Sequence, residues 1–460
     1  MSPEDIVYLL LLIAAIPYGH LVKSSGSPAR KQFLALIAGL IMIVSTAGFG
    51  GIPHSFCTIL GTFLILKTVG PKYGPWSAFL YVFGYLFFFR TCHWYGLPKP
   101  PAYSNAVQLL VTLRMCTIAF EGFQLNCHNR PATLEEVTAT STLQVSLYDT
   151  FSYGYCYCGL MTGPYYRFTT YIDMLHQKKQ IPSFNVALQR VKYVPFLAAA
   201  YIPLNMYFPV NHLTSSEYIN HAWGSIYRIA YLAPLFSWFR WRFYIGWLLA
   251  ESSCISLALG AYPEECKSRP GQGPTVELSE EQAKMENQKY DFETIRNIKI
   301  WETEFAPTLH KTTKTWNMTV QWWLAQYFYR KFPFKQLRMW ATFLFSAFWH
   351  GVRPGYYLTF MSVPLVIVAQ SLMKKLIQPS EEWETVYDWI NWLILHRCFE
   401  YLSVAFILLD IEAIIKTWSH MYFYNHIMTI FFIILPLILT QNMPVEYAGK
   451  AKSENGKKQS

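Results

Sequence analysis

Apolar runs separated by short polar loops repeat along almost the whole chain. A helix rises 1.5 Å per residue, so about 20 apolar residues cross the ~30 Å hydrocarbon core of a bilayer. Most of the runs approach this length, which predicts an all-α, polytopic transmembrane helical bundle of roughly eleven spans. The runs cover residues 6–22, 33–52, 76–89, 105–120, 193–208, 223–238, 243–262, 358–373, 386–409 and 411–440.

Two further stretches do not fit a straight span. Residues 55–66 are short and follow Pro53, so we expect a tilted or partly inserted helix. Residues 151–175 are aromatic but contain three glycines and Pro164, which predict a broken helix. Non-helical backbone at membrane depth needs protein or a cavity around it, so this segment is either a pocket wall or a helix at the interface.

The composition supports a membrane protein without a separate soluble domain. Of the 460 residues, 53% are hydrophobic and 14% charged, whereas soluble domains contain about 25% charged residues. We expect one integral membrane domain over residues 1–440, with a solvated polar loop at 263–299 and a disordered cytosolic tail over 441–460. The loop ends in the sequence YDFETIRNIKI, whose apolar and aromatic residues predict that this end docks back onto the membrane face.

The net charge of +10 changes this picture little. In a soluble protein it would indicate nucleic acid, but here Lys and Arg concentrate in short loops such as 23–31 and 178–192. This positive-inside pattern places the loops in the cytosol, in contact with anionic membrane lipids, and we expect no nucleic-acid partner. The chain ends in KKQS, which matches a dilysine retrieval signal of endoplasmic reticulum membrane proteins; the alternative is an ordinary basic tail.

The cysteines indicate neither disulfides nor a metal site. The nine cysteines are an odd number and are scattered, so no disulfide framework is implied. Cys156 and Cys158 form a C-x-C pair, but no second pair of Cys or His follows at metal-ligand spacing. The sequence also has no P-loop and no dinucleotide fingerprint, and we expect no cofactor.

Two polar residues in apolar, aromatic helices are the candidate catalytic pair. Asn317 begins the stretch NMTVQWWLAQYFYRKF, and His350 ends the stretch LRMWATFLFSAFWH. Gly351 and Pro354 follow, which predicts that the helix stops at His350. A polar side chain at membrane depth is costly unless it is paired or lines a wet cavity, so each residue is a functional candidate; the alternative is packing.

The pair suggests direct acyl transfer. An imidazole at a helix end can act as a general base, and a carboxamide can bind an oxyanion or a hydroxyl. The sequence has no G-x-S-x-G elbow, so no protein nucleophile is indicated. A base and a neutral donor fit transfer of an acyl group from a thioester to a hydroxyl.

At this point the motifs resemble a known family. An Asn and a His about thirty residues apart, with GLMTGPYYRF, YDFETIRNI, WNMTVQWWLAQY and SAFWHGVRPGYYL, are similar to the membrane-bound O-acyltransferase family. The likeness extends over almost the full chain and is greatest to the family's acyltransferases of lysophosphatidylinositol. It implies transfer of a polyunsaturated acyl chain, typically arachidonoyl, from acyl-CoA as co-substrate to the sn-2 hydroxyl, inside a central tunnel in the endoplasmic reticulum membrane.

The resemblance also implies roles for individual residues. His350 would deprotonate the hydroxyl, and Asn317 would position a substrate or stabilise the oxyanion. The predicted substrate-binding residues are Trp316, Gln321, Trp349, Tyr357, Arg330 and Lys331. The two basic residues of this set would attract the phosphates of coenzyme A. Each of them has an alternative, which is a positive-inside loop for the basic residues and bundle packing for the tryptophans.

Other functions remain open from the sequence. A family member could acylate another lysophospholipid, a sterol or a protein. A non-catalytic lipid transporter or scaffold is the second alternative, although transporters usually show internal repeats and no second copy of the Asn and His pattern is found.

Overall fold

The computed structural model of the chain describes residues 3–70, 72–125, 145–279, 282 and 288–441. The first half of the chain begins with the helices α1 (Pro3–Lys23), α2 (Pro28–Ala47), α3 (Pro53–Thr68), α4 (Gly74–Thr91), α5 (Ala102–Leu125), α6 (Leu147–Gly154), α7 (Phe168–His176), α8 (Ser183–Val191) and α9 (Val194–Tyr207). It continues with α10 (Ser216–Ile219) and α11 (Gly224–Ser256). Short 3-10 turns are 49–51, 92–95, 210–214, 264–266, 293–295, 329–331 and 335–337.

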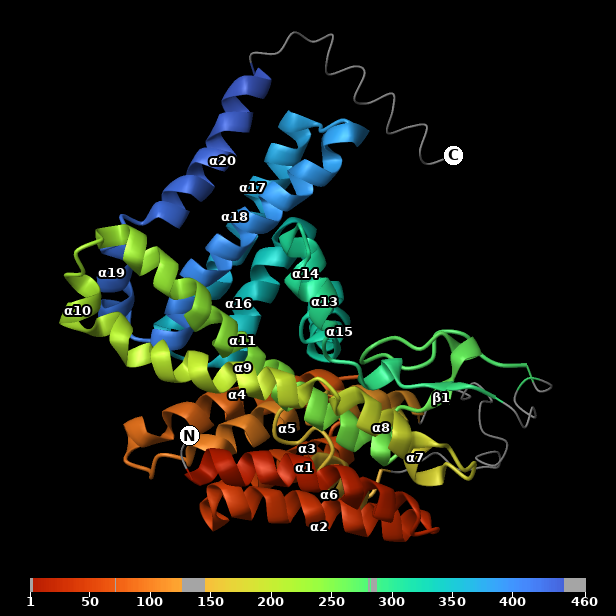
Figure 1. The fold of residues 1–460 in the computed structure, drawn as a ribbon. Coiled ribbons are helices and arrows are strands. Elements are labelled where there is room, and N and C mark those ends of the chain that lie inside the picture. Colours follow the sequence, from red (N-terminus) through yellow and green to blue (C-terminus); the bar gives the residue numbers. More distant parts are fainter. Residues whose placement is uncertain (1–2, 71, 126–144, 280–281, 283–287, 442–460) are drawn as a thin grey trace.

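The second half begins with a short antiparallel ribbon, β1 (Tyr262–Pro263) and β2 (Tyr290–Asp291), in which Tyr262 pairs with Asp291. The helices that follow are α13 (Ile300–Glu304), α14 (Leu309–Thr315), α15 (Met318–Tyr327), α16 (Arg338–His350), α17 (Pro354–Ile377), α18 (Glu381–Leu408), α19 (Ile411–Ser419) and α20 (Tyr424–Gln441). In Figure 1, α1 to α6 form one side of the molecule, α17, α18 and α20 extend from the other, and α11 lies between them.

The all-α prediction is confirmed, but the number of spans is not. Within the described ranges, four helical segments are long and apolar enough to cross a membrane: Pro3–Lys23, Pro28–Ala47, Phe49–Thr68 and Pro354–Ile377. The run predicted over 411–440 is apolar enough to cross a membrane, but it is not straight, because α19 and α20 meet at a bend of 74°. Residues 55–66, expected to be short, belong to a full-length candidate span.

The prediction of two spans at 223–238 and 243–262 is also wrong. One continuous helix, α11, covers 33 residues. The polar residues that suggested a loop are accommodated on the helix instead: Arg240 forms an ion pair with Glu304 at 2.8 Å. No Gly or Pro occurs between the two predicted spans, so nothing in the backbone interrupts the helix.

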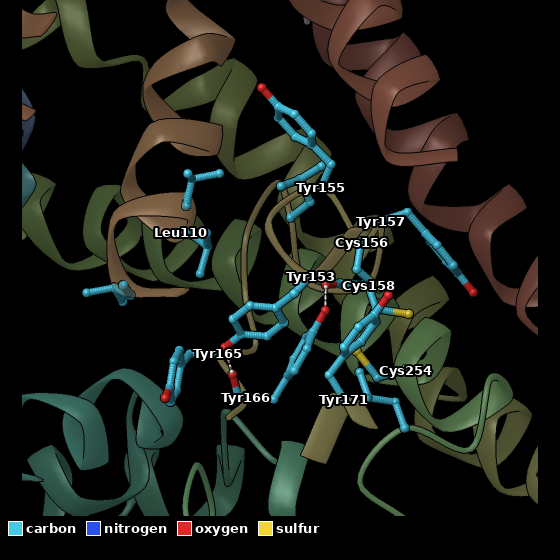
Figure 2. Packing of buried hydrophobic residues seen from close by; sticks show 14 of the residues in the cluster. Leu110, Tyr153, Tyr155, Cys156, Tyr157, Cys158, Tyr165, Tyr166, Tyr171 and Cys254 are labelled. Carbon is cyan, nitrogen blue, oxygen red and sulfur yellow. Dashed lines mark hydrogen bonds between the residues drawn. The ribbon is translucent and has the colours of Figure 1, made fainter. Parts of the chain in front are cut away.

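The broken segment predicted at 151–175 is confirmed, and it is buried. Helix α6 ends at Gly154, α7 begins at Phe168, and the chain between them is not helical. Its carbonyl groups accept hydrogen bonds from Arg114, which is fully buried in α5 and binds Gly154 at 3.1 Å and Cys156 at 2.9 Å. Figure 2 shows the tyrosines and cysteines of this segment packed closely together. The segment is thus packed inside the bundle, and its predicted role as a pocket wall stays a prediction.

The polar loop at 263–299 is only partly solvated, contrary to the prediction. Its amide at Gly271 donates to the Thr294 carbonyl at 2.8 Å, and both Gly271 and Gly273 are buried. The end of the loop packs into the bundle, where Thr294 and Asn297 are fully buried, and its predicted docking onto the membrane face stays a prediction. The predicted tail at 441–460, with its KKQS sequence, lies outside the described residues apart from Gln441.

The two basic loops predicted to face the same side lie together. The ammonium group of Lys23 donates to the Ile181 carbonyl at 2.8 Å and to the Ser183 hydroxyl at 2.9 Å. Lys31 reaches the Gln177 carbonyl at 3.3 Å. Lys23 is the last residue of α1, so the first residue of that helix, Pro3, lies at the end away from these loops. Loops 23–31 and 177–192 therefore share one face of the bundle.

Candidate active site

Asn317 lies immediately before the first residue of α15. Its backbone is in the left-handed region, with φ 48° and ψ 46°, which Asn tolerates better than most non-glycine residues. Its carbonyl accepts a helical hydrogen bond from the Gln321 amide at 2.9 Å. The half-buried side chain caps no amide of the helix, so the carboxamide is not needed to begin α15.

A buried polar network fixes the start of α15. The Asn297 carbonyl accepts a hydrogen bond from the Met318 amide at 2.9 Å, and the Asn297 side chain accepts one from the Thr319 hydroxyl at 2.6 Å. The Asn297 amide donates to the Glu251 carboxylate at 2.7 Å. Glu251 forms an ion pair with Arg190 at 2.8 Å. Helix α15 therefore begins at a point that α11 and α8 determine.

His350 is the last residue of α16, and Gly351 is its C-terminal cap, as predicted. Aromatic rings surround the imidazole. Phe360 stacks against it at 4.9 Å and Tyr356 at 5.9 Å between ring centroids, and Phe406 meets it edge-on at 5.4 Å. These rings come from α17 and α18, so three helices meet at His350.

Arg90, near the end of α4, binds the C-terminal end of α16. Its guanidinium donates to the Phe348 carbonyl at 2.7 Å. It also donates to the carbonyls of Trp349 at 2.5 Å and His350 at 3.1 Å. A helix leaves its last carbonyls without intrahelical partners, and a cation there complements the helix dipole. Arg90 therefore fixes the main chain that carries His350.

The polar atoms of the two candidate catalytic side chains can still bind a substrate. Within the part of the chain that the structure describes, neither the Asn317 carboxamide nor the His350 imidazole forms a hydrogen bond, and both side chains are half-buried. Neighbouring polar groups are engaged, for example Trp349, whose indole N–H donates to the Leu109 carbonyl at 3.4 Å. Because partly buried polar groups are normally paired, this availability is typical of substrate-binding residues.

A row of aromatic rings connects the two ends of the site. The successive centroid distances are 6.0, 5.4, 6.1 and 5.4 Å along Trp316, Phe243, Phe239, Phe406 and His350. Two of these rings belong to α11, which thus lies between Asn317 and His350. Since neither residue hydrogen bonds to the other in the described chain, a substrate would have to approach both.

The structure brings some predicted substrate-binding residues to this site. Trp349 meets the His350 ring edge-on at 4.8 Å. Tyr357 lies in the first turn of α17, next to the Tyr356 ring that stacks on His350. Trp316 precedes Asn317 and packs against Trp247 at 4.8 Å.

The side chains of three other predicted residues are engaged with other groups. The Gln321 side chain donates to the Thr313 carbonyl of α14. Arg330 is exposed and bonds Gln326 at 2.8 Å. Lys331 is exposed over the Phe120 ring at 4.9 Å. The last two remain available to a charged ligand at the other end of α16 from His350.

The sequence interpretation missed the surroundings of His350. Tyr356, Phe360 and Phe406 are three of many aromatic residues, and nothing in the sequence distinguishes them. Arg90 carries a signal, because it follows the apolar run 76–89 directly and an arginine there needs a partner. That partner, the end of α16, is more than 250 residues away in sequence.

The chain matches the model of the membrane-bound O-acyltransferase family over residues 81–411, a range that contains both Asn317 and His350. It belongs to this family and is a multi-pass membrane O-acyltransferase.

Several curated proteins are similar over nearly the whole length. Membrane-bound acylglycerophosphatidylinositol O-acyltransferase of Danio rerio is 40% identical over 94% of this chain and 93% of its own. The enzyme of the same name from Xenopus laevis is 37% identical over 99% of both chains. The enzyme of the same name from Homo sapiens is 36% identical over 96% of both chains.

Proposed function

We propose that this protein transfers an acyl chain from acyl-CoA to the sn-2 hydroxyl of lysophosphatidylinositol. The names of the similar proteins support the acceptor. The observation that carries the mechanism is the availability of the Asn317 and His350 side chains at two helix ends. We propose a polyunsaturated acyl chain, arachidonoyl in the first place, and a location in the endoplasmic reticulum membrane.

The two side chains would act on opposite sides of one transfer. The imidazole of His350 takes the proton of the sn-2 hydroxyl as its oxygen attacks the thioester carbonyl. The carboxamide N–H of Asn317 donates to the oxyanion that develops on that carbonyl. The C–S bond then breaks, the acyl ester remains on the lipid, and the departing thiolate of coenzyme A takes the proton from His350.

The surroundings of His350 suit a base. The neutral imidazole is the form that accepts a proton, and two features favour it: the apolar rings around it and the guanidinium of Arg90 at its helix end. The end of α16 away from His350 follows the basic link of residues 330–338, which we propose attracts the phosphates of coenzyme A. Coenzyme A is thus a co-substrate and not a resident cofactor.

Substituting the pair tests this mechanism. In membranes that carry the protein, His350→Ala should lower acyl transfer by about 10²- to 10⁴-fold, because the general base is lost. Asn317→Ala should lower it by about 10²-fold, because one oxyanion donor is lost. Formation of labelled phosphatidylinositol from acyl-CoA and lysophosphatidylinositol measures both effects.

Exposed residues of the same type supply the controls. His310→Ala and Asn185→Ala should leave the rate unchanged, because both residues are exposed and belong to α14 and α8. A panel of lysophospholipids with different head groups, each with arachidonoyl-CoA and palmitoyl-CoA, tests the substrates. Full activity of His350→Ala would refute the mechanism, and equal transfer to every head group would refute the acceptor.

A further inference from the structure

Arg242 is an unpaired arginine in the middle of the longest helix. Of the three arginines of α11, Arg228 donates to the Ile219 carbonyl at 2.7 Å and Arg240 pairs with Glu304. Arg242 is exposed and forms no ion pair or hydrogen bond with any residue in the described ranges. An arginine inside a membrane bundle is costly without a partner, so this group is expected to face a polar ligand or a wet cavity.

The guanidinium of Arg242 lies on the aromatic row of the site. It is 4.4 Å from the centre of the Phe239 ring and 5.1 Å from that of Phe243. Phe239 packs on Phe406, which contacts the His350 ring. Arg242 therefore lies beside the aromatic row that connects the surroundings of Asn317 with those of His350.

Arg353 is a second arginine near this site, because it directly precedes α17, the helix whose Tyr356 ring stacks on His350. The Tyr356 side chain, which stacks on His350, lies within electrostatic reach of Arg90, Arg353 and Arg242. Arg90 is occupied by the carbonyls of α16, but Arg353 is exposed and has no ion pair or hydrogen bond from its side chain in the described chain. Arg242 and Arg353 thus both act on Tyr356, the residue whose ring stacks on His350.

One acidic group, Asp5, acts electrostatically on Arg242. Asp5 is within electrostatic reach of Arg242. Its carboxylate accepts a hydrogen bond from the Tyr103 hydroxyl at 2.5 Å. Asp5 therefore moderates the positive charge at Arg242.

We propose that Arg242, assisted by Arg353, binds the phosphate group of the lysophospholipid acceptor and so places its sn-2 hydroxyl at His350. This inference rests on the proposed function. Arginine suits the role because its planar fork binds two phosphate oxygens at once.

The dimensions of the two substrates decide which phosphate binds there. In a lysophospholipid four covalent bonds, about 5 Å, separate the sn-2 oxygen from the phosphorus. In acyl-CoA the thioester sulfur and the nearest phosphorus are separated by the whole pantetheine arm, roughly 15 Å when extended. A phosphate bound beside the imidazole therefore belongs to the acceptor, and the phosphates of coenzyme A lie farther away.

Steady-state kinetics of Arg242→Gln, Arg242→Lys, Arg353→Gln and Arg330→Gln test this assignment. Arg242→Gln should raise the KM for lysophosphatidylinositol about tenfold or more, because a charge-assisted hydrogen bond is lost, and leave the KM for acyl-CoA within about twofold. Arg353→Gln should show the same pattern with a smaller rise. Arg242→Lys retains the charge and should lie between wild type and Arg242→Gln. Arg330→Gln should raise only the KM for acyl-CoA.

A second measurement does not depend on turnover. Lysophosphatidylinositol should raise the thermal unfolding temperature of the detergent-solubilised wild type more than that of Arg242→Gln or Arg242→Lys. Arg30→Gln, an exposed arginine at the start of α2, is the control and should match wild type in both assays.

The outcomes separate the two proposals. An unchanged KM for lysophosphatidylinositol in both Arg242 variants, or a rise confined to acyl-CoA, would overturn the assignment of Arg242. If the wild type transfers no acyl group to lysophosphatidylinositol, the proposed function fails, and the unfolding assay still decides whether Arg242 binds a lysolipid phosphate. If Arg242→Gln does not fold, Arg242→Lys and Arg353→Gln carry the test.

Discussion

His350 is positioned by main-chain contacts and by rings. The described structure shows no carboxylate or carbonyl that binds its imidazole, so no third group orients the ring by a hydrogen bond. The stacked rings of Tyr356 and Phe360 instead orient the imidazole plane. The hydrogen bonds from Arg90 to the preceding carbonyls fix the position of the main chain that carries it. Arg90 is therefore a positioning residue.

Arg90→Lys should lower kcat and change the KM values little. A lysine cannot reach several carbonyls in a fixed geometry as the guanidinium does, so the end of α16 would be less well placed for the transfer. We expect a loss of about tenfold or more in kcat, the size of a charge-assisted hydrogen bond. Steady-state rates with both substrates measure it.

Asn105→Ala is the matched control for Arg90→Lys. Asn105 accepts a hydrogen bond from the Nε–H of the same guanidinium at 3.4 Å, whereas the other two nitrogens bind the carbonyls of α16. We expect this variant to retain most of the wild-type kcat. Equal losses in the two variants, or a change in KM alone, would argue against a positioning role for Arg90.

Among the structural elements, α15 depends for its start on the loop 263–299, which the sequence predicts to be solvated. The loop brings Gly271 against the helix, where a Cβ atom would lie 2.9 Å from the Thr319 carbonyl oxygen and 3.0 Å from the Trp322 Cβ. Gly271 also has φ +73°, which disfavours any other residue. The loop thus supports the helix that begins after Asn317.

Gly271→Ala should destabilise the protein by about 2–5 kcal/mol, the sum of left-handed backbone strain and overpacking. Gly273→Ala is the control, because its φ is +86° but the nearest atom to an added Cβ is 3.7 Å away. That variant should lose only about 1–2 kcal/mol, from the backbone. Thermal unfolding of the purified protein compares them, and equal losses would contradict the close packing of the loop on α15.

The sequence predicted much at this scale because helix ends have local signals. Gly351 after His350 and the glycines of the broken segment are such signals, and both predictions are confirmed. The continuity of α11 could not be predicted, because the charges at Arg240 and Arg242 suggested a loop. Whether charged residues end a span or lie on it depends on partners distant in sequence, such as Glu304. The roles of the candidate site residues stay predictions.

At the scale of the whole molecule, the loops divide between two faces. The loops 23–31 and 177–192 share one face through the contacts of Lys23. The start of α1 lies at the other end of the bundle, where Asp5 bonds Tyr103 near the loop that carries Lys99. The positive-inside rule assigns the first face to the cytosol.

Cysteine labelling in sealed microsomes tests this orientation. In a background with Cys57 and Cys127 replaced by Ser, Ser24→Cys should react with a membrane-impermeant maleimide in intact vesicles. Lys99→Cys should react only after the vesicles are permeabilised, because the two exposed positions lie on opposite faces. The reverse pattern would invert the orientation, and labelling of both sites in intact vesicles would contradict the two-face arrangement.

Because α11 is one continuous helix, it fixes the distance between Arg242 and Glu251. Arg242 and Glu251 are nine residues apart on one helix, so about 13 Å along the helix axis separates the arginine on the aromatic row from the carboxylate that anchors the start of α15. Point substitutions leave that spacing intact. One inserted residue between them would rotate Arg242 by about 100° relative to Glu251 and move its guanidinium off the aromatic row. Arg242 and Glu251 therefore keep their relative directions on α11 only if the number of residues between them changes by close to a whole number of helical turns.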